Sequence, residues 1–280
     1  MKSKVLLILF FCGFLSAHAA DNGELKGRFV IGVDGEGNER RICFSQGNLV
    51  HSTSANAWSF ADNQYEVLGA DNYDNGELAD KIDLFGWSGN ASSASNYGIS
   101  NETGSMYYSG DFKDWGANRI TNGGNEPGIW RTLTADEWTY LLEHHQQGHA
   151  VVEGVTGVIL VPINTTVTLA DSYSADEWAA AEAQGLVFLP YTGYRAPSSS
   201  EVIDLTNNGK YWTATTPSGN RYADAIICTS HAEMLSVAPN RYFGHAVRLV
   251  KDKSSCEVTF TITADPEQGS CIITVSKTDN

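Results

Sequence analysis

Apolar residues recur with helical spacing in one segment after residue 130. Thr134 has the residue type of a helix N-cap, and Glu137 follows three positions later, which completes a capping box. Gly148 has the residue type that ends a helix. The spacing i, i+3, i+4, i+7 predicts a helix with one inward face, formed by Trp138, Leu141, Leu142 and His145.

A second segment repeats this pattern about forty positions later. Ser174 and Glu177 form another capping box, and Gly185 marks the end of the helix. Trp178 and Ala181 fall on the inward face. We therefore expect two helices, each anchored by a buried tryptophan in its first turn.

Short runs of β-branched and aromatic residues predict strands elsewhere. Residues 28–33 and 41–44 predict a hairpin, because the Gly-rich stretch 34–38 supplies the positive φ of a tight turn. Near the end of the domain, Val247 and Leu249 share one strand face, which we expect to lie in the core. Further strands are expected at residues 155–161, 186–189, 210–215, 221–228 and 245–250.

Residues 45–128 are rich in Gly, Asn, Ser and Asp and show little periodicity. Disordered segments are poor in aromatic residues, whereas this segment holds many. We expect long ordered loops whose rings pack onto the core, namely Trp58, Phe60, Tyr65, Tyr73, Phe85, Trp87, Tyr97, Tyr107, Tyr108, Phe112 and Trp115.

The last part of the chain has a different pattern. Alternating residues on both sides of a turn at 265–269 predict a β-hairpin, which is marginal on its own in water. It either packs on the main domain or begins a β-rich repeat. Two helices, short strands and long loops indicate an α+β fold. We assign a signal peptide to residues 1–19, one α+β domain to 20–252 and the hairpin to 253–280.

The N-terminus has the pattern of a signal peptide. Lys2 and Lys4 precede an apolar run at residues 5–15, and Ala-His-Ala at 17–19 matches a cleavage site. Neither this run nor any other apolar stretch reaches the roughly 20 residues of a transmembrane helix. Cys12 lies inside the run behind two phenylalanines, which disfavours a lipoprotein anchor. We expect a soluble, exported protein.

The chain is acidic, with a net charge of −15 that becomes −17 when Lys2 and Lys4 leave with the signal peptide. Nucleic acids are bound through cationic contacts to phosphate, so a nucleic-acid partner is not expected. A solvated acidic surface accounts for the carboxylates, with a calcium site as the alternative. No other cofactor is expected.

Four cysteines remain after export, and they allow three disulfide pairings. Cys43 and Cys228 lie in apolar, strand-like runs, where a free cysteine acts as a small hydrophobic residue. Cys256 and Cys271 flank the predicted C-terminal hairpin without standing opposite each other. We expect Cys43 and Cys228 to pack in the core.

Several motifs occur in an order that resembles a known family. Residues 130–138 (WRTLTADEW) resemble the RLPTEAEWEYA segment of C-type-lectin-like domains of the formylglycine-generating-enzyme kind. Residues 211–215 and 244–251 resemble the YWSST and GxSVRLVK strands of the Fibrobacter succinogenes major paralogous domain. The version in Bacteroides-type secreted surface proteins is similar at 44–49, 82–87 and 187–195, and the resemblance covers about residues 27–252.

The resemblance implies a C-type-lectin-like fold, a secreted or outer-surface location on a Gram-negative bacterium, and ligand binding. Formylglycine-generating enzymes use a paired-cysteine copper site, and neither Cys43 nor Cys228 lies in a motif similar to it. The calcium and sugar motif of true C-type lectins is also missing, since residues 125–128 only half resemble it. An enzyme is therefore not expected.

The sequence motifs of common active sites provide little evidence for an enzymatic function in this chain. GxSxG, HExxH and P-loop motifs are missing from the sequence. His145 and His149 have the i, i+4 spacing of a helical metal site, but Gly148 between them is expected to end the helix. The histidines at 144, 145 and 149 then fit a helix C-terminus, where the dipole favours them.

The loops around the last strands are the candidate ligand site. Aromatic and amide side chains there suit recognition of a glycan or a protein. The alternative is that the tyrosines pack and the polar groups are solvated. We expect Tyr222, Asn240, Tyr242 and His245 to lie together and be partly exposed. The complete candidate set is Trp212, Asn220, Tyr222, Asp224, His231, Asn240, Tyr242 and His245.

The function expected from these observations is a non-enzymatic, adhesin-like binding module, secreted or attached to the cell surface. Two alternatives remain: a catalytic relative of formylglycine-generating enzymes, and a purely structural part of a surface assembly.

Overall fold

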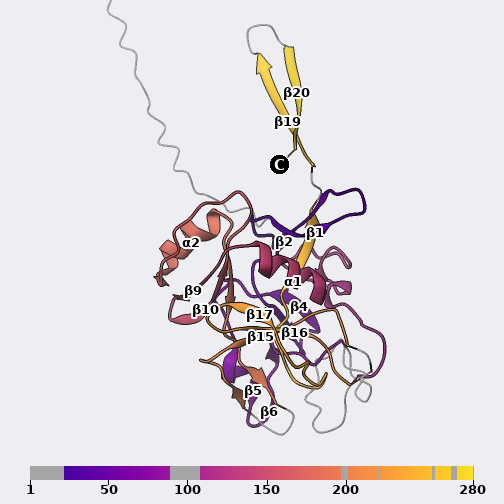
Figure 1. Cartoon of the computed structure of the whole chain (residues 1–280), viewed down its shortest axis with the longest axis vertical. Helices are drawn as coiled ribbons and strands as arrows, with labels where there is room; N and C mark the ends of the chain where they lie inside the picture. The colour runs from indigo at the N-terminus through magenta and orange to yellow at the C-terminus, as the bar shows by residue number, and fades with distance from the viewer. Residues whose placement is uncertain are drawn as a thin grey trace, which may run out of the picture.

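The computed structural model describes residues 22–88, 108–196, 201–217, 219, 221–253, 256–265 and 270–279 (Figure 1). The predicted signal peptide, Tyr97, Tyr107 and the candidate ligand residue Asn220 lie outside the described residues. In the described part, the fold is α+β, as predicted: two α-helices and several small, mostly antiparallel sheets. No helix in that part is long and apolar enough to cross a membrane.

One sheet joins the two ends of the main domain. The predicted N-terminal hairpin forms its first two strands, with Phe29 opposite Ile42. The final strand of the domain pairs with this hairpin on one side, where Val250 lies opposite Phe44, and with the strand before the first helix on the other. The sheet order is β1 (Phe29–Val33), β2 (Glu39–Phe44), β18 (Leu249–Lys253), β8 (Arg131–Thr132).

A second sheet lies between and after the helices. Its order is β11 (Ser172–Tyr173), β9 (Gln147–Val152), β10 (Val155–Leu160), β12 (Val187–Pro190). Only the β11–β9 pair in this sheet is parallel. The third, antiparallel sheet has the order β15 (Gly209–Trp212), β16 (Ala225–Cys228), β17 (Ala232–Met234).

Residues 45–128 contain more regular structure than predicted. A sheet in the order β4 (Ala57–Phe60), β3 (Leu49–Ser52), β7 (Lys81–Ile82) and two 3₁₀ turns, η1 (Gly69–Asn72) and η3 (Trp115–Ala117), lie in this segment. These elements have four residues or fewer, too few for a periodic signal. The expected burial of aromatic side chains is confirmed for Trp58, Phe60, Phe85, Trp87 and Trp115.

Two-stranded sheets are formed by β5 (Tyr73–Asp74) with β6 (Glu77–Leu78) and by β13 (Tyr194–Arg195) with β14 (Val202–Ile203).

Helix α1 (Ala135–His144) begins at the predicted capping box, with both reciprocal hydrogen bonds between Thr134 and Glu137 present. The predicted end at Gly148 is wrong: His145 is the C-cap and β9 has begun by Gln147. The buried His145 ring explains the early end. Its Nε2 accepts a hydrogen bond from the Val30 amide at 3.0 Å, and this tertiary contact holds residue 145 in an extended conformation.

Helix α2 (Ala175–Ala183) also begins at its predicted capping box. Trp178 is buried, with its ring centroid 5.4 Å from that of Phe188 in β12. Gly185 ends the helix region with φ +94°. A Cβ at this residue would lie 2.7 Å from the Cα of Gly27, so both the backbone conformation and the close approach require glycine.

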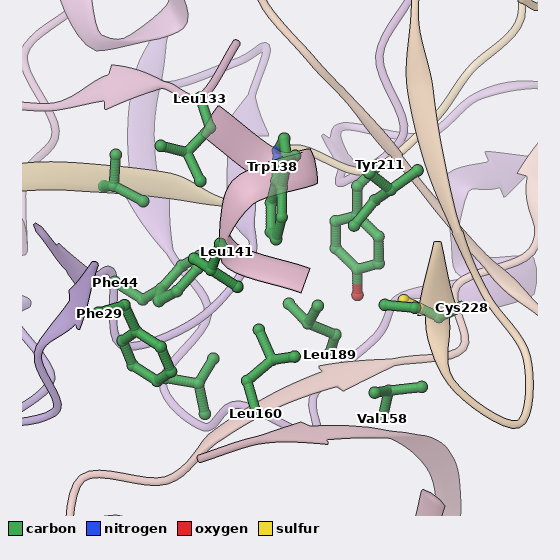
Figure 2. Packing of buried hydrophobic residues seen from close by; sticks show 14 of the residues in the cluster. Phe29, Phe44, Leu133, Trp138, Leu141, Val158, Leu160, Leu189, Tyr211 and Cys228 are labelled. Atoms are coloured by element: carbon green, nitrogen blue, oxygen red, sulfur yellow. The ribbon is translucent and has the colours of Figure 1, made fainter. Parts of the chain in front are cut away.

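The main core lies between α1, the two four-stranded sheets and the β15–β16–β17 sheet (Figure 2). Trp138 packs on Phe44 of β2 with ring centroids 5.7 Å apart, which joins the helix to the terminal sheet. On the other side of the cluster, Tyr211 of β15 donates a hydrogen bond to the Pro190 carbonyl at 2.7 Å. A second cluster is rich in tryptophan, with Trp58, Trp87, Trp115, Trp130 and Trp212 among its members.

The C-terminal hairpin consists of β19 (Cys256–Asp265) and β20 (Ser270–Asp279), and it is longer than predicted. Cys256 pairs with Asp279 and Cys271 with Ala264, which confirms that the two cysteines are not opposite each other. Cys43 and Cys228 are free and buried, as expected.

Candidate ligand-binding face

The β16–β17 hairpin continues beyond its strands toward the predicted site. Tyr222 forms a backbone bridge with Asn240, and the Arg241 amide donates to the Arg221 carbonyl at 3.1 Å. Between the pairs Ile226–Met234 and Tyr222–Asn240, one strand advances four residues and the other six. The two extra residues make a bulge, and they bring Val237 to the surface.

Tyr222 and Val237 are the most exposed large hydrophobic residues of this hairpin end, at 41% and 75%. The Arg221 guanidinium lies 5.9 Å from the Tyr222 ring centroid and donates to Asn240 Oδ1 at 3.1 Å. The Tyr222 ring, the Arg221 cation and the Asn240 amide therefore lie together, and Val237 is exposed on the same hairpin end. We call Arg221, Tyr222, Val237, Asn240 and Tyr242 the Tyr222 face.

A buried arginine holds the backbone behind the Tyr222 face. The Arg241 guanidinium lies 4.3 Å from the Trp87 ring centroid and is almost fully enclosed. It donates to the carbonyl of Tyr222 at 3.0 Å and to that of Tyr108 at 3.0 Å. Longer bonds reach Gly110 at 3.3 Å and Gly219 at 3.4 Å. Since a guanidinium is a rigid planar donor, these contacts tie three separate loops together.

Arg241 is the residue that sequence reasoning missed. It stands between Asn240 and Tyr242, two candidates, but nothing in the local sequence separates a buried arginine from a solvated one. Its partners at Trp87 and Tyr108 are distant in the chain, so only the tertiary structure assigns its role.

Tyr242 is partly exposed and begins a row of ring contacts that leads away from the face. Its ring centroid lies 5.3 Å from that of Phe243, which in turn lies 5.8 Å from that of Tyr194. Lys210 Nζ stands 3.6 Å from the Tyr194 centroid, a cation–π contact. These partly buried residues extend the aromatic surface beyond the predicted set.

His245 and Trp212 lie under the surface, so the predicted partial exposure of His245 is wrong. Residue 245 exchanges two backbone hydrogen bonds of 2.9 Å with Phe85, which places it inside the structure and not in the loop before the strand. The two ring centroids of His245 and Trp212 are 4.3 Å apart. Burial, together with the nearby Lys210 charge, lowers the pKa of His245 well below its usual value, so the ring is neutral.

Asp224 is fixed through its backbone beside β15, and His231 lies away from the Tyr222 face. Asp224 is bonded through its backbone to Thr213 and Thr215, and burial and the charge of Asp136 in α1 raise its pKa. His231 is exposed in the turn between β16 and β17, with Nε2 3.6 Å from Glu233 Oε2. It therefore belongs to the opposite end of the hairpin from Tyr222.

The three histidines considered for a metal site do not form one cluster. His144 stacks on Tyr140 with centroids 4.0 Å apart, His145 is buried, and His149 is exposed in β9. Across the described ranges, no group of three or more His, Cys, Asp or Glu residues has metal-binding geometry.

The two core thiols are poor nucleophiles. Burial raises the pKa of Cys43 to about 11, and burial also raises that of Cys228 strongly. A thiolate is the reactive form of cysteine, so both side chains are held in the unreactive state.

Comparisons of the chain with protein-family models, with curated proteins and with solved structures find no match. The geometry of the Tyr222 face is therefore the basis on which a function can be argued.

Proposed function

We propose that the protein is a non-enzymatic binding module that recognises a glycan or protein ligand through the Tyr222 face. The observation that carries this proposal is the exposed Tyr222 ring on a hairpin end whose backbone is fixed by Arg241. A ligand that meets such a face does not have to order the loops first, and this lowers the entropic cost of binding.

The side chains of the face suit recognition. A tyrosine ring offers a large contact area with few rotatable bonds, and its hydroxyl gives direction. Arg221 and Asn240 stand beside it as donor and acceptor, and Val237 offers exposed apolar surface on the same hairpin end. Exposed aromatic anchors surrounded by polar groups are typical of binding sites.

The proposal includes the C-type-lectin-like fold and the secreted or outer-surface location that the sequence resemblance implies. Two structural features support the fold. The WRTLTADEW segment supplies β8 and the start of α1, and the final strand β18 closes the same sheet as the N-terminal hairpin. The signal-peptide pattern and the net charge of −15 support the location.

Redox catalysis is not part of the proposal. A copper–thiolate reaction needs deprotonated, accessible cysteines, and the pKa values of Cys43 and Cys228 are both raised by burial.

The test is a screen of the purified protein against glycan and protein arrays, repeated with Tyr222→Ala. We expect one class of ligand to bind the wild-type protein and to be lost or weakened in the variant. Val33→Ala is the matched control, because Val33 is an exposed aliphatic residue of β1 outside the face. Equal binding by the wild type and Tyr222→Ala would contradict the proposal, as would equal losses in both variants.

A further inference from the structure

A groove of about 440 Å³ lies beside the β3–β4–β7 sheet, and none of its lining residues belongs to the Tyr222 face. Its volume is in the range of small-molecule sites. Val50 from β3 and Phe60 from β4 contribute apolar surface, and Val67 and Leu68 contribute more from the following loop. The groove can therefore receive an aliphatic chain.

The charged side chains that line the groove are mainly acidic. Asp62, Glu66 and Asp83 contribute three carboxylates, and Lys81 contributes one ammonium group. Lys81 also interacts with the neighbouring Asp80, which lies outside the groove and offsets its charge. The electrostatic potential of the groove therefore favours a cation.

Asp83 distinguishes this groove from an ordinary acidic surface. The residue is 2% exposed, and its carboxylate accepts hydrogen bonds from the Leu68 amide at 2.8 Å and from Asn72 Nδ2 at 2.7 Å. No salt bridge to Asp83 occurs within the described residues. Buried carboxylates are usually balanced by a positive charge, and each oxygen can accept a further hydrogen bond. Burial accordingly raises the pKa of this carboxyl.

We propose that the groove binds an alkylammonium group, with the methylene stem on the Val50–Leu68 side and the ammonium beside the carboxylates. This chemistry is shared by lysine side chains and by polyamines. A methylene stem gains from contact with apolar surface, while an ammonium–carboxylate hydrogen bond is stronger than a neutral one. The inference does not rest on the Tyr222 face.

The test is a titration of the purified protein with n-butylammonium, followed through backbone amide shifts in NMR spectra. n-Butanol and butyrate have similar stems with a neutral and a negative head. We expect saturable shifts at Val50, Ser59 and Thr121 with n-butylammonium, affinity weaker by about tenfold with n-butanol, and no binding of butyrate. Equal affinity for n-butanol, or shifts confined to other residues, would overturn the proposal. If calcium ions saturate the shifts of the same amides at a lower concentration than n-butylammonium does, the groove is a metal site and the proposal is overturned.

Two pairs of variants separate this site from the general acidity of the protein. Asp62→Asn with Glu66→Gln should weaken n-butylammonium binding about twofold to fivefold. Glu143→Gln with Asp171→Asn removes the same charge from exposed positions outside the groove and should leave binding unchanged. Equal losses in both pairs would mean that only net charge matters, which would overturn the proposal.

Lys81→Gln provides a test that misfolding cannot imitate. Removing the one cation of the groove should tighten n-butylammonium binding about twofold, whereas an unfolded variant would lose it. Weaker binding by a folded Lys81→Gln variant would overturn the proposal. Spermidine and a short peptide with a single lysine then distinguish a polyamine from a protein side chain as the source. Tyr222→Ala should bind n-butylammonium like the wild type, so the two sites can fail independently.

Discussion

The guanidinium of Arg195 occupies the space in which residue 244 would carry a side chain. A Cβ on Gly244 would stand 2.7 Å from the Cβ of Arg195 and 2.8 Å from its Nε. The two residues also exchange backbone hydrogen bonds of 2.9 Å in both directions, so neither can move away. Glycine is thus required at residue 244 because the Arg195 side chain lies too close to leave room for a Cβ.

We expect Gly244→Ala to destabilise the fold by about 1–3 kcal/mol, because the added methyl group overpacks a fully enclosed contact. Urea denaturation of the variant measures this change. Gly35→Ala is the control, since a Cβ there meets nothing within 4 Å and residue 35 is exposed. Its stability should stay within about 0.5 kcal/mol of the wild type. A Gly244→Ala variant as stable as Gly35→Ala would show that Arg195 can shift freely.

Trp138→Ala should cost about 3–5 kcal/mol through lost burial and the remaining cavity, because the ring is fully enclosed in the main core. Trp178→Ala, in the smaller cluster behind α2, should fall in the same range. Loss of the N-cap hydroxyl in Thr134→Ala should cost only about 1 kcal/mol. Thermal and urea unfolding compare the three. Equal effects of the tryptophan and cap substitutions would contradict the assigned role of the rings.

The pH dependence of stability has an identifiable source at Glu137. Burial raises the pKa of this carboxyl, but hydrogen bonds from Arg131 and Thr134 outweigh it, so the pKa lies below its usual 4.5. A carboxyl with a lowered folded-state pKa stabilises the fold above its unfolded-state pKa. That contribution is lost as the pH falls through the folded-state value.

The expected result is a loss of stability as the pH falls below about 4.5, with a smaller loss in Glu137→Gln. Urea denaturation at a series of pH values checks this. Glu143→Gln, in the last turn of the same helix, is exposed and should keep the wild-type pH profile. Identical profiles for the wild type and Glu137→Gln would assign the acid sensitivity to other carboxylates.

The features that the sequence predicted well are local. Both capping boxes lie within four residues, and each tryptophan follows its cap at a fixed helical position. The N-terminal hairpin was also found, because its turn residues stand between two apolar runs. Such signals depend on neighbours in the chain and do not need the tertiary structure.

The features that were missed depend on distant partners. The end of α1 is set by the bond between His145 and Val30, and β9 is held by its pairing with β10. The predicted residues of the candidate site show the same contrast between local signals and distant partners. Tyr222 is on the surface as expected, whereas His245 is buried and its backbone is hydrogen-bonded to that of Phe85. Short strands with partners far along the chain leave too weak a pattern for periodicity to detect.

Arg241→Lys should loosen the Tyr222 face without removing any of its side chains. A lysine keeps the charge but cannot bond the carbonyls of two loops with one planar group, so buried carbonyls lose their donors. We expect destabilisation of about 1–3 kcal/mol and faster hydrogen exchange around residues 219–222. Arg221→Lys, on the exposed side of the face, should leave exchange unchanged. Unchanged exchange in Arg241→Lys would mean that the loops are rigid for another reason.

Tyr222→Ala should separate ligand binding from folding. Tyr222 is 41% exposed, and the bond from Arg241 goes to its backbone carbonyl, so truncation removes contact area but leaves that bond in place. We expect unfolding free energy within about 0.5 kcal/mol of the wild type and ligand affinity weaker by more than about 1 kcal/mol. Tyr242→Ala should weaken binding in the same direction, because Tyr242 belongs to the same face and is partly exposed. Calorimetry with the ligand found by array screening and urea denaturation give the two quantities. If alanine at residue 222 unfolds the domain, the tyrosine is a packing residue and the Tyr222 face is not the binding site.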